Sequence, residues 1–402
     1  MKVSPGRLAA ARALLDVEEG RHLDRGLERR APDDPADRGL AWHLALGVTR
    51  RRGALDGLIA QLAKRPVQTL DPEVLTALRV GLFELHFSRT PDHAAVDQAV
   101  RLCIALRAGR AKGFVNAILR RSQHRTLDDR LTVNHPDWLV KRWRGRYGLE
   151  PTASWCAAND SEPPLCLALR SDRRPDALAG EPARAGGQEV PNTLMVAGGS
   201  PTQLPGFDDG AFWVMDPAAA ATTDLLQAQA GERVLDACAA PGGKTLRLAA
   251  SGAHVTATDG DAERLGRLRE NLERVGYSAD VRCVRWGEEQ LEASFDAALV
   301  DAPCTGLGTL RRHPEIRWLR RPSDPAAMAL IQAPILAAVA DRVRPGGRLV
   351  YAVCSAEPEE GRDLVAGFLE DVGGWTLAAE LDTAPPQHGE DGFYAARLVK
   401  AP

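Results

Sequence analysis

One stretch of the chain predicts the architecture of its second half: Arg233-Val234-Leu235-Asp236-Ala237-Cys238-Ala239-Ala240-Pro241-Gly242-Gly243-Lys244-Thr245. It begins as a short apolar strand and passes through a loop of Ala, Pro and Gly into a helix at Thr245. Further strands are expected at 254–259, 297–301 and 347–353, with helices at 262–275 and 326–343. This alternation predicts a mostly parallel, doubly wound α/β sheet.

The loop within this stretch predicts a bound ligand. Backbone N–H groups that carry no bulky side chains can approach a bound group closely. The sequence lacks both the GxGxxG spacing of a dinucleotide loop and the GxxxxGK[ST] spacing of a phosphate loop. Asp259, at the end of the next expected strand, suits a ribose diol. Asp236, Gly242 and Asp259 together favour a nucleoside-type cofactor such as S-adenosylmethionine, and the alternative is a plain strand-to-helix turn with a helix-capping acid.

Two cysteines occupy matching places after later strands. Cys304 follows the strand expected at 297–301, and Cys354 follows the strand expected at 347–353. The carboxyl ends of parallel strands build the active site of an open α/β sheet. A thiolate there can add to C6 of cytosine and activate C5 for methylation, while an acid near N3 stabilises charge and another group aids release. Asp301, Cys304 and Cys354 supply these groups, although small apolar cysteines can also simply fill sheet ends.

Length and composition indicate a multidomain globular protein. A chain of 402 residues is too long for one ordinary core. It has no apolar run of transmembrane length, and its N-terminus lacks a signal pattern. Seven cysteines without CxxC spacing argue against a disulfide framework, and no His/Cys cluster has the spacing of a metal site. We therefore expect a cytoplasmic protein that binds no metal and no membrane.

Three segments of the chain differ in pattern. Residues 1–125 repeat apolar side chains at helical spacing and predict an all-helical domain. Residues 126–210 combine helical and strand signals, with a strand expected at 165–169, and predict linker helices and a small α+β subdomain. Residues 211–402 form the α/β domain. Residues 1–146 hold 27 Lys and Arg against 17 Asp and Glu, which suggests a polyanionic partner, although a solvated Arg-rich helical surface explains the count almost as well.

The motifs of the α/β segment resemble those of the RsmB/Sun group of RNA cytosine-C5 methyltransferases. The resemblance implies that Cys354 is the nucleophile, that Cys304 aids product release, and that Asp301 lies near both the cofactor and the base. It also implies a catalytic role for Lys244. DNA cytosine methyltransferases use the cysteine of Pro-Cys as nucleophile, so the order of the two roles rests on the family. The S-adenosylmethionine contacts that the resemblance implies are Cys238, Ala239, Ala240, Pro241, Gly242, Gly243, Lys244, Asp259 and Asp301.

The chain departs from this family's pattern at three places. Val353 precedes the nucleophile where the family usually has Thr, and Glu359-Glu360-Gly361 stands in place of Glu-Glu-Asn. Near Val284-Arg285-Trp286-Gly287 the family tends to place an Asp against the adenine ring, whereas this chain offers Arg285. None of these changes removes a group that the chemistry requires.

The helical segment resembles the antitermination factor NusB as it occurs fused to RsmB-type enzymes. The resemblance rests on stretches such as Lys64-Arg65-Pro66, Val96-Asp97-Gln98-Ala99-Val100 and Gly113-Phe114-Val115-Asn116-Ala117. This domain order implies 16S ribosomal RNA as the substrate, methylated in the family at the cytosine of position 967. Because a base inside structured RNA must be exposed before attack, we expect free or partly assembled RNA to be the substrate. We also expect the enzyme to act as a monomer.

A basic segment after the first catalytic cysteine is expected to contact this RNA. Its residues Arg311, Arg312, His313 and Arg317 could hold phosphates or stack on an unstacked base. Two alternatives for the whole chain remain. It could methylate cytosine in tRNA or at another ribosomal site, which the helical domain disfavours. It could also be a non-catalytic RNA-binding assembly factor, which the retained catalytic groups disfavour.

Overall fold

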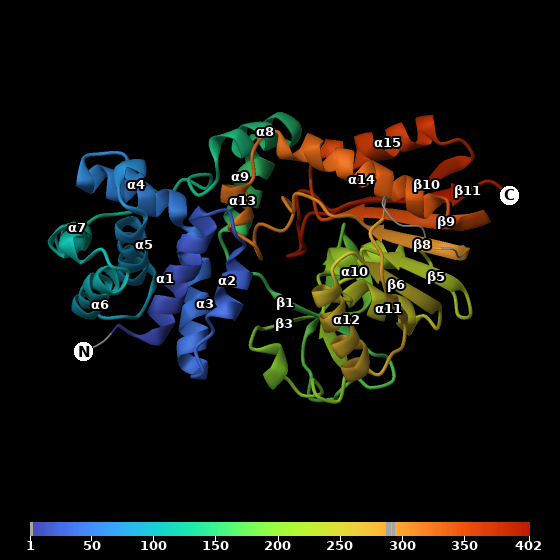
Figure 1. Ribbon diagram of the computed structural model, residues 1–402, viewed down its shortest axis with the longest axis horizontal. Coiled ribbons are helices and arrows are strands. Elements are labelled where there is room, and N and C mark those ends of the chain that lie inside the picture. The colour runs from blue at the N-terminus through green and yellow to red at the C-terminus, as the bar shows by residue number, and fades with distance from the viewer. Residues whose placement is uncertain (1–2, 287–290, 292–293) are drawn as a thin grey trace. The chain divides into compact units, whose positions relative to one another are not determined.

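The computed structural model describes residues 3–286, 291 and 294–402, so Gly287 lies outside the described residues. Two compact units make up the chain: Met1–Glu162 with Leu310–Arg320, and Pro163–Thr309 with Arg321–Pro402 (Figure 1). This division differs from the three predicted segments, because the helices of residues 137–159 belong to the first unit and the strands that follow belong to the second.

Every regular element that the structure describes in the first unit is helical, as the pattern of residues 1–125 predicted. Helices begin at recognisable caps: the Ser4 side chain accepts from Arg7 N–H before α1, and Asp34 accepts from Asp37 N–H before α3. Its helices are α1 (Pro5–Glu18), α2 (Leu23–Arg29), α3 (Pro35–Arg50), α4 (Arg52–Ala63), α5 (Pro72–Phe87), α6 (Asp92–Ala105), α7 (Lys112–Ser122), α8 (Asp137–Tyr147), α9 (Leu149–Asn159) and α13 (Ile316–Leu319), with 3₁₀ turns η1 (Val67–Thr69) and η2 (Gly109–Ala111).

Helix α5 forms the centre of this unit. Its residues are buried continuously from Val74 to Glu84, and α1, α3, α4, α6 and α7 contribute to the same apolar core. Arg79 of α5 is buried as well, but its guanidinium bonds Asp56 Oδ1 at 2.7 Å and Glu18 Oε1 at 2.7 Å. The buried charge is therefore paired and hydrogen-bonded, as a charge in a helical core must be.

The second unit begins with a small antiparallel sheet in the order β2-β3-β1-β4. Its strands are β1 (Leu165–Leu169), β2 (Glu181–Ala185), β3 (Gln188–Val196) and β4 (Phe212–Val214). The strand expected at 165–169 is confirmed. Because β4 pairs with β1, the small sheet extends past residue 210, where the sequence predicted a boundary.

The large sheet of the second unit has seven strands in the order β10-β11-β9-β8-β5-β6-β7. Strands β5 to β9 pair in parallel, and β11 and β10 add an antiparallel edge. The predicted doubly wound α/β sheet is thus confirmed. The order reverses between β5 and β8, the position where such sheets open a crevice for ligands. The strands are β5 (Arg233–Ala237), β6 (His254–Asp259), β7 (Asp280–Cys283), β8 (Phe295–Asp301), β9 (Val343–Val353), β10 (Trp375–Asp382) and β11 (Tyr394–Lys400).

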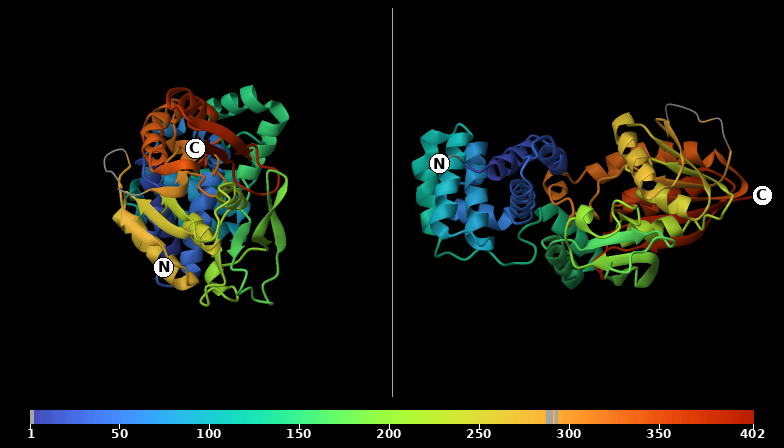
Figure 2. Two further views of the ribbon diagram at one scale, coloured as in Figure 1. Left: turned by 90° about the vertical axis from the view of Figure 1, so that its right-hand side faces the viewer. Right: turned by 90° about the horizontal axis from the view of Figure 1, so that it is seen from below.

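Helices cover both faces of the large sheet (Figure 2). Apolar side chains of α14 and α15 form one core with alternate residues of the strands, and α10, α11 and α12 pack on the other face. Along the described residues, no helix combines the length and the apolar character needed to span a bilayer. These helices are α10 (Pro217–Asp224), α11 (Gly243–Ala250), α12 (Ala262–Val275), α14 (Asp324–Ala340) and α15 (Arg362–Asp371), with 3₁₀ turns η3 (Pro201–Gln203) and η4 (Pro358–Glu360).

Candidate active site

The two cysteines singled out from the sequence lie side by side beyond the ends of neighbouring parallel strands. β8 ends at Asp301 and β9 ends at Val353, and Asp301 pairs in register with Ala352. The Sγ atoms of Cys304 and Cys354 are 3.3 Å apart, and both residues are partly exposed thiols that form no disulfide. The two cysteines therefore belong to one site.

This contact changes the acidity of Cys304. The hydrogen bond with Cys354 and then burial raise the pKa of the Cys304 thiol well above its ordinary value. When one of two adjacent thiols ionises, the remaining proton is shared as an S–H···S contact. The contact therefore makes Cys304 a weaker acid than an isolated thiol.

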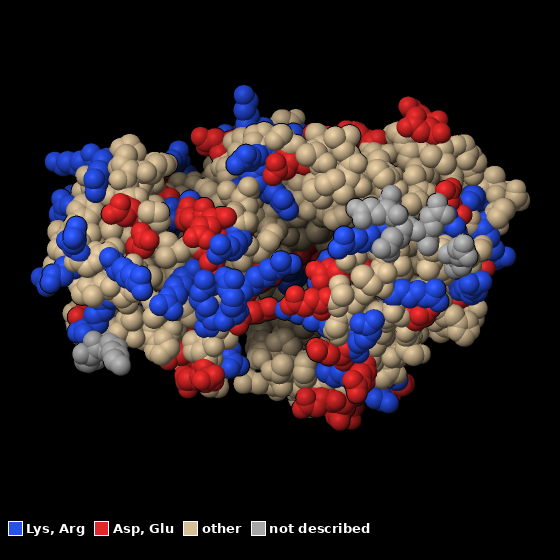
Figure 3. Space-filling view, in the orientation of Figure 1, with Lys and Arg blue, Asp and Glu red and all other residues tan. Residues whose placement is uncertain are grey.

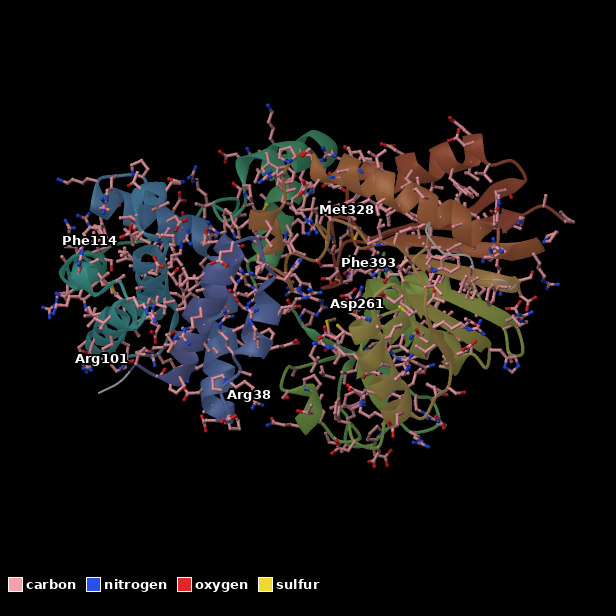
Figure 4. The ribbon with its side chains drawn as sticks, in the orientation of Figure 1. Arg38, Arg101, Phe114, Asp261, Met328 and Phe393 are labelled. Carbon is pink, nitrogen blue, oxygen red and sulfur yellow. The ribbon has the colours of Figure 1, made fainter. Side chains whose placement is uncertain are left out.

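Lys244 and Asp301 form an ion pair in the same site. Lys244 Nζ lies 2.7 Å from Asp301 Oδ2, with 12% of the Lys244 side chain and 30% of the Asp301 side chain exposed. Burial alone would lower the pKa of Lys244, but the charge of Asp301 and its hydrogen bond, with smaller effects from Cys354 and Asp236, raise it above its ordinary value. Phe393, labelled in Figure 4, has its ring centre 5.4 Å from the same Nζ. Lys244 is therefore a fixed ammonium group that orients the Asp301 carboxylate.

The loop between β5 and α11 lies at the carboxyl end of the same sheet. Gly242 has φ of +109°, and an added Cβ would lie 3.0 Å from Leu268 Cγ, so this position requires glycine. Asp259, the last residue of β6, accepts hydrogen bonds from Ala240 N–H at 3.2 Å and Asp261 N–H at 3.0 Å. A carboxylate has lone pairs beyond these two bonds, so it can also accept from a ribose hydroxyl. The structure thus brings together the expected cofactor residues Cys238, Ala239, Ala240, Pro241, Gly242, Gly243, Lys244, Asp259 and Asp301.

Asp236, at the base of this loop, is fully buried. Thr245 Oγ1 donates to its Oδ2 at 2.6 Å, while its Oδ1 has no hydrogen-bond partner among the described residues. Around it, an added Cβ on Gly243 would come no closer than 4.0 Å to a neighbouring side chain, that of Trp213. An unused acceptor below an open glycine loop fits a nucleoside-type methyl donor. Burial raises the pKa of Asp236 to about 7.

Asp236→Asn is expected to stabilise the second unit increasingly as the pH rises. The pKa of Asp236 is raised in the folded state, so the unfolded chain loses this proton near pH 4 and the folded chain only near pH 7. The wild type therefore loses stability across that window, while the asparagine variant does not. Between about pH 5 and about pH 8 their difference in unfolding free energy should grow by about 3 kcal/mol, because about two pH units of this window lie in that range and each is worth about 1.36 kcal/mol. Urea unfolding at about pH 5 and about pH 8 measures it, and an equal difference at both pH values would contradict the assignment.

The buried carboxylate of Glu360 joins the two cysteine loops, a contact that no sequence pattern predicted. Its Oε1 accepts from Thr305 N–H at 2.7 Å, and its Oε2 accepts from the hydroxyls of Thr305 and Ser355. Thr305 follows Cys304 directly and Ser355 follows Cys354 directly. Burial raises the pKa of Glu360 above its ordinary value, although these hydrogen bonds oppose the shift.

The segment of residues 310–320 packs within the first unit. Arg311 and Arg312 are partly exposed and His313 is exposed, whereas Arg317 is 0% exposed. The Arg317 guanidinium bonds Asp160 Oδ1 at 2.7 Å and the carbonyls of Asn159 and Leu310 at 3.0 Å each. The structure corrects the expectation for Arg317, because a guanidinium enclosed in this way is not presented to an RNA phosphate.

Arg317→Met is expected to destabilise the first unit by about 3 kcal/mol or more, because it removes the nearer of the two arginines that pair with the buried Asp160. Thermal or urea unfolding measures the change, and Arg25→Met, at an exposed position on α2, is the control. Weaker RNA binding with unchanged stability would instead restore Arg317 as an RNA contact.

Arg285 lies where the sequence left the adenine contact open. Val284 N–H donates to Asp259 O at 3.1 Å, and the Arg285 side chain lies 3.1 Å from the position of a Cβ on Gly260. Arg285 is therefore placed beside the end of β6, near the acid expected to bind ribose. Within residues 3–286, 291 and 294–402, no group of three or more His, Cys, Asp or Glu side chains is arranged to hold a metal ion.

The order of the large sheet, the glycine loop after β5 and the acid at the end of β6 define the methyltransferase class of α/β proteins. Comparison with known proteins narrows this class. Residues 223–399 match the family model described as 16S rRNA methyltransferase RsmB/F, residues 4–124 match the NusB family, and residues 135–174 match an RsmF/B-like ferredoxin-like domain. The chain belongs to the ribosomal RNA small subunit methyltransferase B family.

Relatives along the whole chain support this membership. The chain is 37% identical to Ribosomal RNA small subunit methyltransferase B of Salmonella enteritidis PT4, with 98% of each chain covered. It is also 37% identical to the protein of that name from Pseudomonas syringae pv. tomato, with 98% of this chain and 96% of that one covered. The crystal structure of PH0851 matches 100% of both chains with a TM-score of 0.80 at 21% identity, which shows the same fold. Both sequence resemblances, to RsmB-type methyltransferases and to NusB, are confirmed.

Proposed function

We propose that this chain methylates C5 of a cytosine in 16S ribosomal RNA and uses S-adenosylmethionine as the methyl donor. The observation that carries the proposal is the 3.3 Å contact between Cys304 and Cys354 in the site that holds the Lys244–Asp301 ion pair. Family membership supports ribosomal RNA of the small subunit as the substrate. S-adenosylmethionine, when bound, supplies an electrophilic methyl group, and the groups that make the base reactive belong to the protein.

Cys354 acts as the nucleophile in this proposal. Its thiolate forms a bond to C6 of cytosine, and the electron pair of the C5–C6 double bond becomes available at C5. Asp301 lies near N3; as the ring takes up a proton from water at N3, the Asp301 carboxylate accepts a hydrogen bond from the N3–H that forms, while Lys244 holds this carboxylate at 2.7 Å. Once C5 is methylated, its proton must leave before the C6–S bond can break.

Cys304 takes this proton in the release step. In the free enzyme the contact with Cys354 is the first cause that raises the pKa of Cys304. Once the Cys354 sulfur is bonded to C6 it carries no negative charge, so this cause is removed and Cys304 gives up its own proton to water more readily. The Cys304 thiolate then accepts the C5 proton, the C5–C6 double bond forms again, and Cys354 leaves as a thiolate. These steps are consistent with the order of roles that the family resemblance implies, in which Cys354 attacks and Cys304 aids release.

The RNA contacts are proposed on the first unit. Lys and Arg side chains are spread over its helices (Figure 3), in keeping with the excess of basic residues in the first 146 positions. Arg311, Arg312 and His313 remain proposed contacts of the RNA, since all three reach the surface. Free or partly assembled 16S RNA is the proposed substrate, because the target base must be unstacked to reach two thiols at a sheet edge. We propose that the enzyme acts as a monomer.

Bisulfite sequencing of RNA from a deletion strain tests this function. One 16S cytosine should lose its methylation, and the wild-type gene should restore it while the Cys354→Ala gene should not. If 16S methylation is unchanged and a cytosine in tRNA or another ribosomal site is lost instead, the substrate is that RNA. If no methylated cytosine changes, the chain is a non-catalytic assembly factor.

A further inference from the structure

We propose that Glu360 is a positioning residue that holds the loops of Cys304 and Cys354 at one fixed separation. Its side chain is 0% exposed, and its carboxylate accepts hydrogen bonds from Thr305, Ser355 and Gln332. It acts through Thr305 and Ser355, the residues that directly follow the two cysteines. The activity measurement below rests on the proposed function, whereas the thiol measurement does not.

Four hydrogen bonds converge on the Glu360 carboxylate. Oε1 accepts from Thr305 N–H at 2.7 Å and from Gln332 Nε2 at 3.2 Å. Oε2 accepts from the hydroxyls of Thr305 and Ser355, whose oxygen atoms are 3.1 Å apart. The Glu360 carboxylate thus accepts from the Thr305 N–H in the Cys304 loop and from one hydroxyl in each cysteine loop, Thr305 in the first and Ser355 in the second. Removing it would take a shared acceptor away from these buried donors.

Glu360 and its hydrogen-bond partners are themselves anchored to the sheet and to a helix. Tyr351, within β9, donates its hydroxyl to the Glu360 carbonyl at 2.7 Å. Gln332, buried on α14, also donates to the carbonyl of Pro303 at 2.9 Å, on the residue before Cys304. These links come from elements that are already packed in the core. Glu360 can therefore transmit a rigid position to both loops rather than move with them.

Attack on C6 and release of the product depend to different degrees on the relative position of the two cysteine loops. Of the two cysteines, attack on C6 requires only Cys354, whereas release requires Cys304 to reach the C5 proton while Cys354 is bonded to the same ring. A shift of one loop against the other therefore impairs release more than attack. Misplacement by about 1 Å can slow a step by about 100-fold.

A thiol probe measures the separation without any methyl transfer. Phenylarsine oxide binds two adjacent thiols at once, with loss of water, and it should bind the wild type through Cys304 and Cys354. Glu360→Ala should weaken this binding by about 10-fold or more. Once arsenic has bound one sulfur, the effective concentration of the second sulfur at the arsenic falls when that sulfur is out of place. Glu370→Ala, the same change at an exposed position on α15, should bind like the wild type. Binding to Glu360→Ala that equals wild-type binding would overturn the proposal.

An activity measurement separates positioning from simple loss of structure. With 16S RNA and S-adenosylmethionine, Glu360→Ala should raise the ratio of covalent protein–RNA adduct to product, because attack continues while release slows. Glu360→Gln should restore most of the wild-type ratio, since its amide oxygen still accepts from Thr305 N–H and its NH₂ group can donate to the two hydroxyl oxygens. A Glu360→Ala variant that loses attack and release in equal proportion would contradict the proposal, and so would a Glu360→Gln variant as impaired as Glu360→Ala.

Should Glu360→Ala not fold, the double variant Thr305→Val/Ser355→Ala replaces it, because it removes both hydroxyls and keeps the carboxylate and the Thr305 N–H contact. It should weaken phenylarsine oxide binding and raise the adduct ratio in the same directions. If no RNA is methylated by the wild type but the thiol probe responds as expected, the proposed function fails and the positioning role stands.

Discussion

Cys354→Ala is expected to abolish methylation of 16S RNA, with a loss of about 10⁴-fold or more. The variant lacks the sulfur that bonds C6, and without this bond C5 of cytosine is a poor nucleophile. Cys304 lies 3.3 Å away in the wild type, and burial, which does not depend on Cys354, still raises the pKa of its thiol in this variant, so Cys304 is not expected to replace the nucleophile. Transfer of a labelled methyl group from S-adenosylmethionine to a 16S transcript measures the effect.

Cys103→Ala provides the control for this loss. Cys103 is a buried cysteine of α6 in the helical unit, outside the active site, and its removal should leave methylation unchanged. A Cys354→Ala variant that still methylates, beside an inactive Cys304→Ala variant, would assign the nucleophile to Cys304. The order would then be that of the DNA cytosine methyltransferases.

The sheet and the positions of the proposed catalytic groups were predictable from the sequence because each depends on a local pattern. β1 and β6 have the residue bounds that the apolar runs predicted, and α12 spans the residues that its helical spacing predicted. Cys304 and Cys354 could be placed in one site without a structure, because both follow strands that were expected to be parallel, and parallel strands present their carboxyl ends at one edge. The antiparallel β10 and β11 were missed, since they follow the alternating part of the pattern.

Two features could not be predicted because their partners are distant in the sequence. Glu360 is 55 positions from Thr305, and a glutamate beside another glutamate after a proline has the pattern of a solvated turn. Arg317 is 157 positions from Asp160, and a run of basic residues has the pattern of an RNA surface. In both cases the burial of the charge depends on a carboxylate or hydroxyl that only the folded chain brings near. Local patterns therefore predict the sheet and its reactive groups, while tertiary pairing decides which charges are exposed.

Cys304→Ala is expected to trap a covalent adduct between Cys354 and the RNA. The variant keeps the nucleophile, Asp301 and Lys244, so attack on C6 and methyl transfer to C5 can proceed. It lacks the group that removes the C5 proton, so the C6–S bond cannot break and turnover should fall by about 10²–10⁴-fold. A denaturing gel detects the adduct as a slowly migrating band that contains both protein and labelled RNA.

The double variant Cys304→Ala/Cys354→Ala is the matched control, because it lacks the sulfur that would bond the RNA and should give no such band. Adduct in Cys354→Ala instead of Cys304→Ala would reverse the two roles, and normal turnover in Cys304→Ala would remove Cys304 from the release step.

The adduct band of Cys304→Ala should also require S-adenosylmethionine for full yield. Before methyl transfer C5 holds one hydrogen, and the addition of Cys354 to C6 reverses readily. After transfer C5 holds both the methyl group and the hydrogen, and only loss of that proton lets the thiolate leave. The 3.3 Å distance between the two sulfur atoms is what allows the proposed base to reach a ring already bonded to its neighbour.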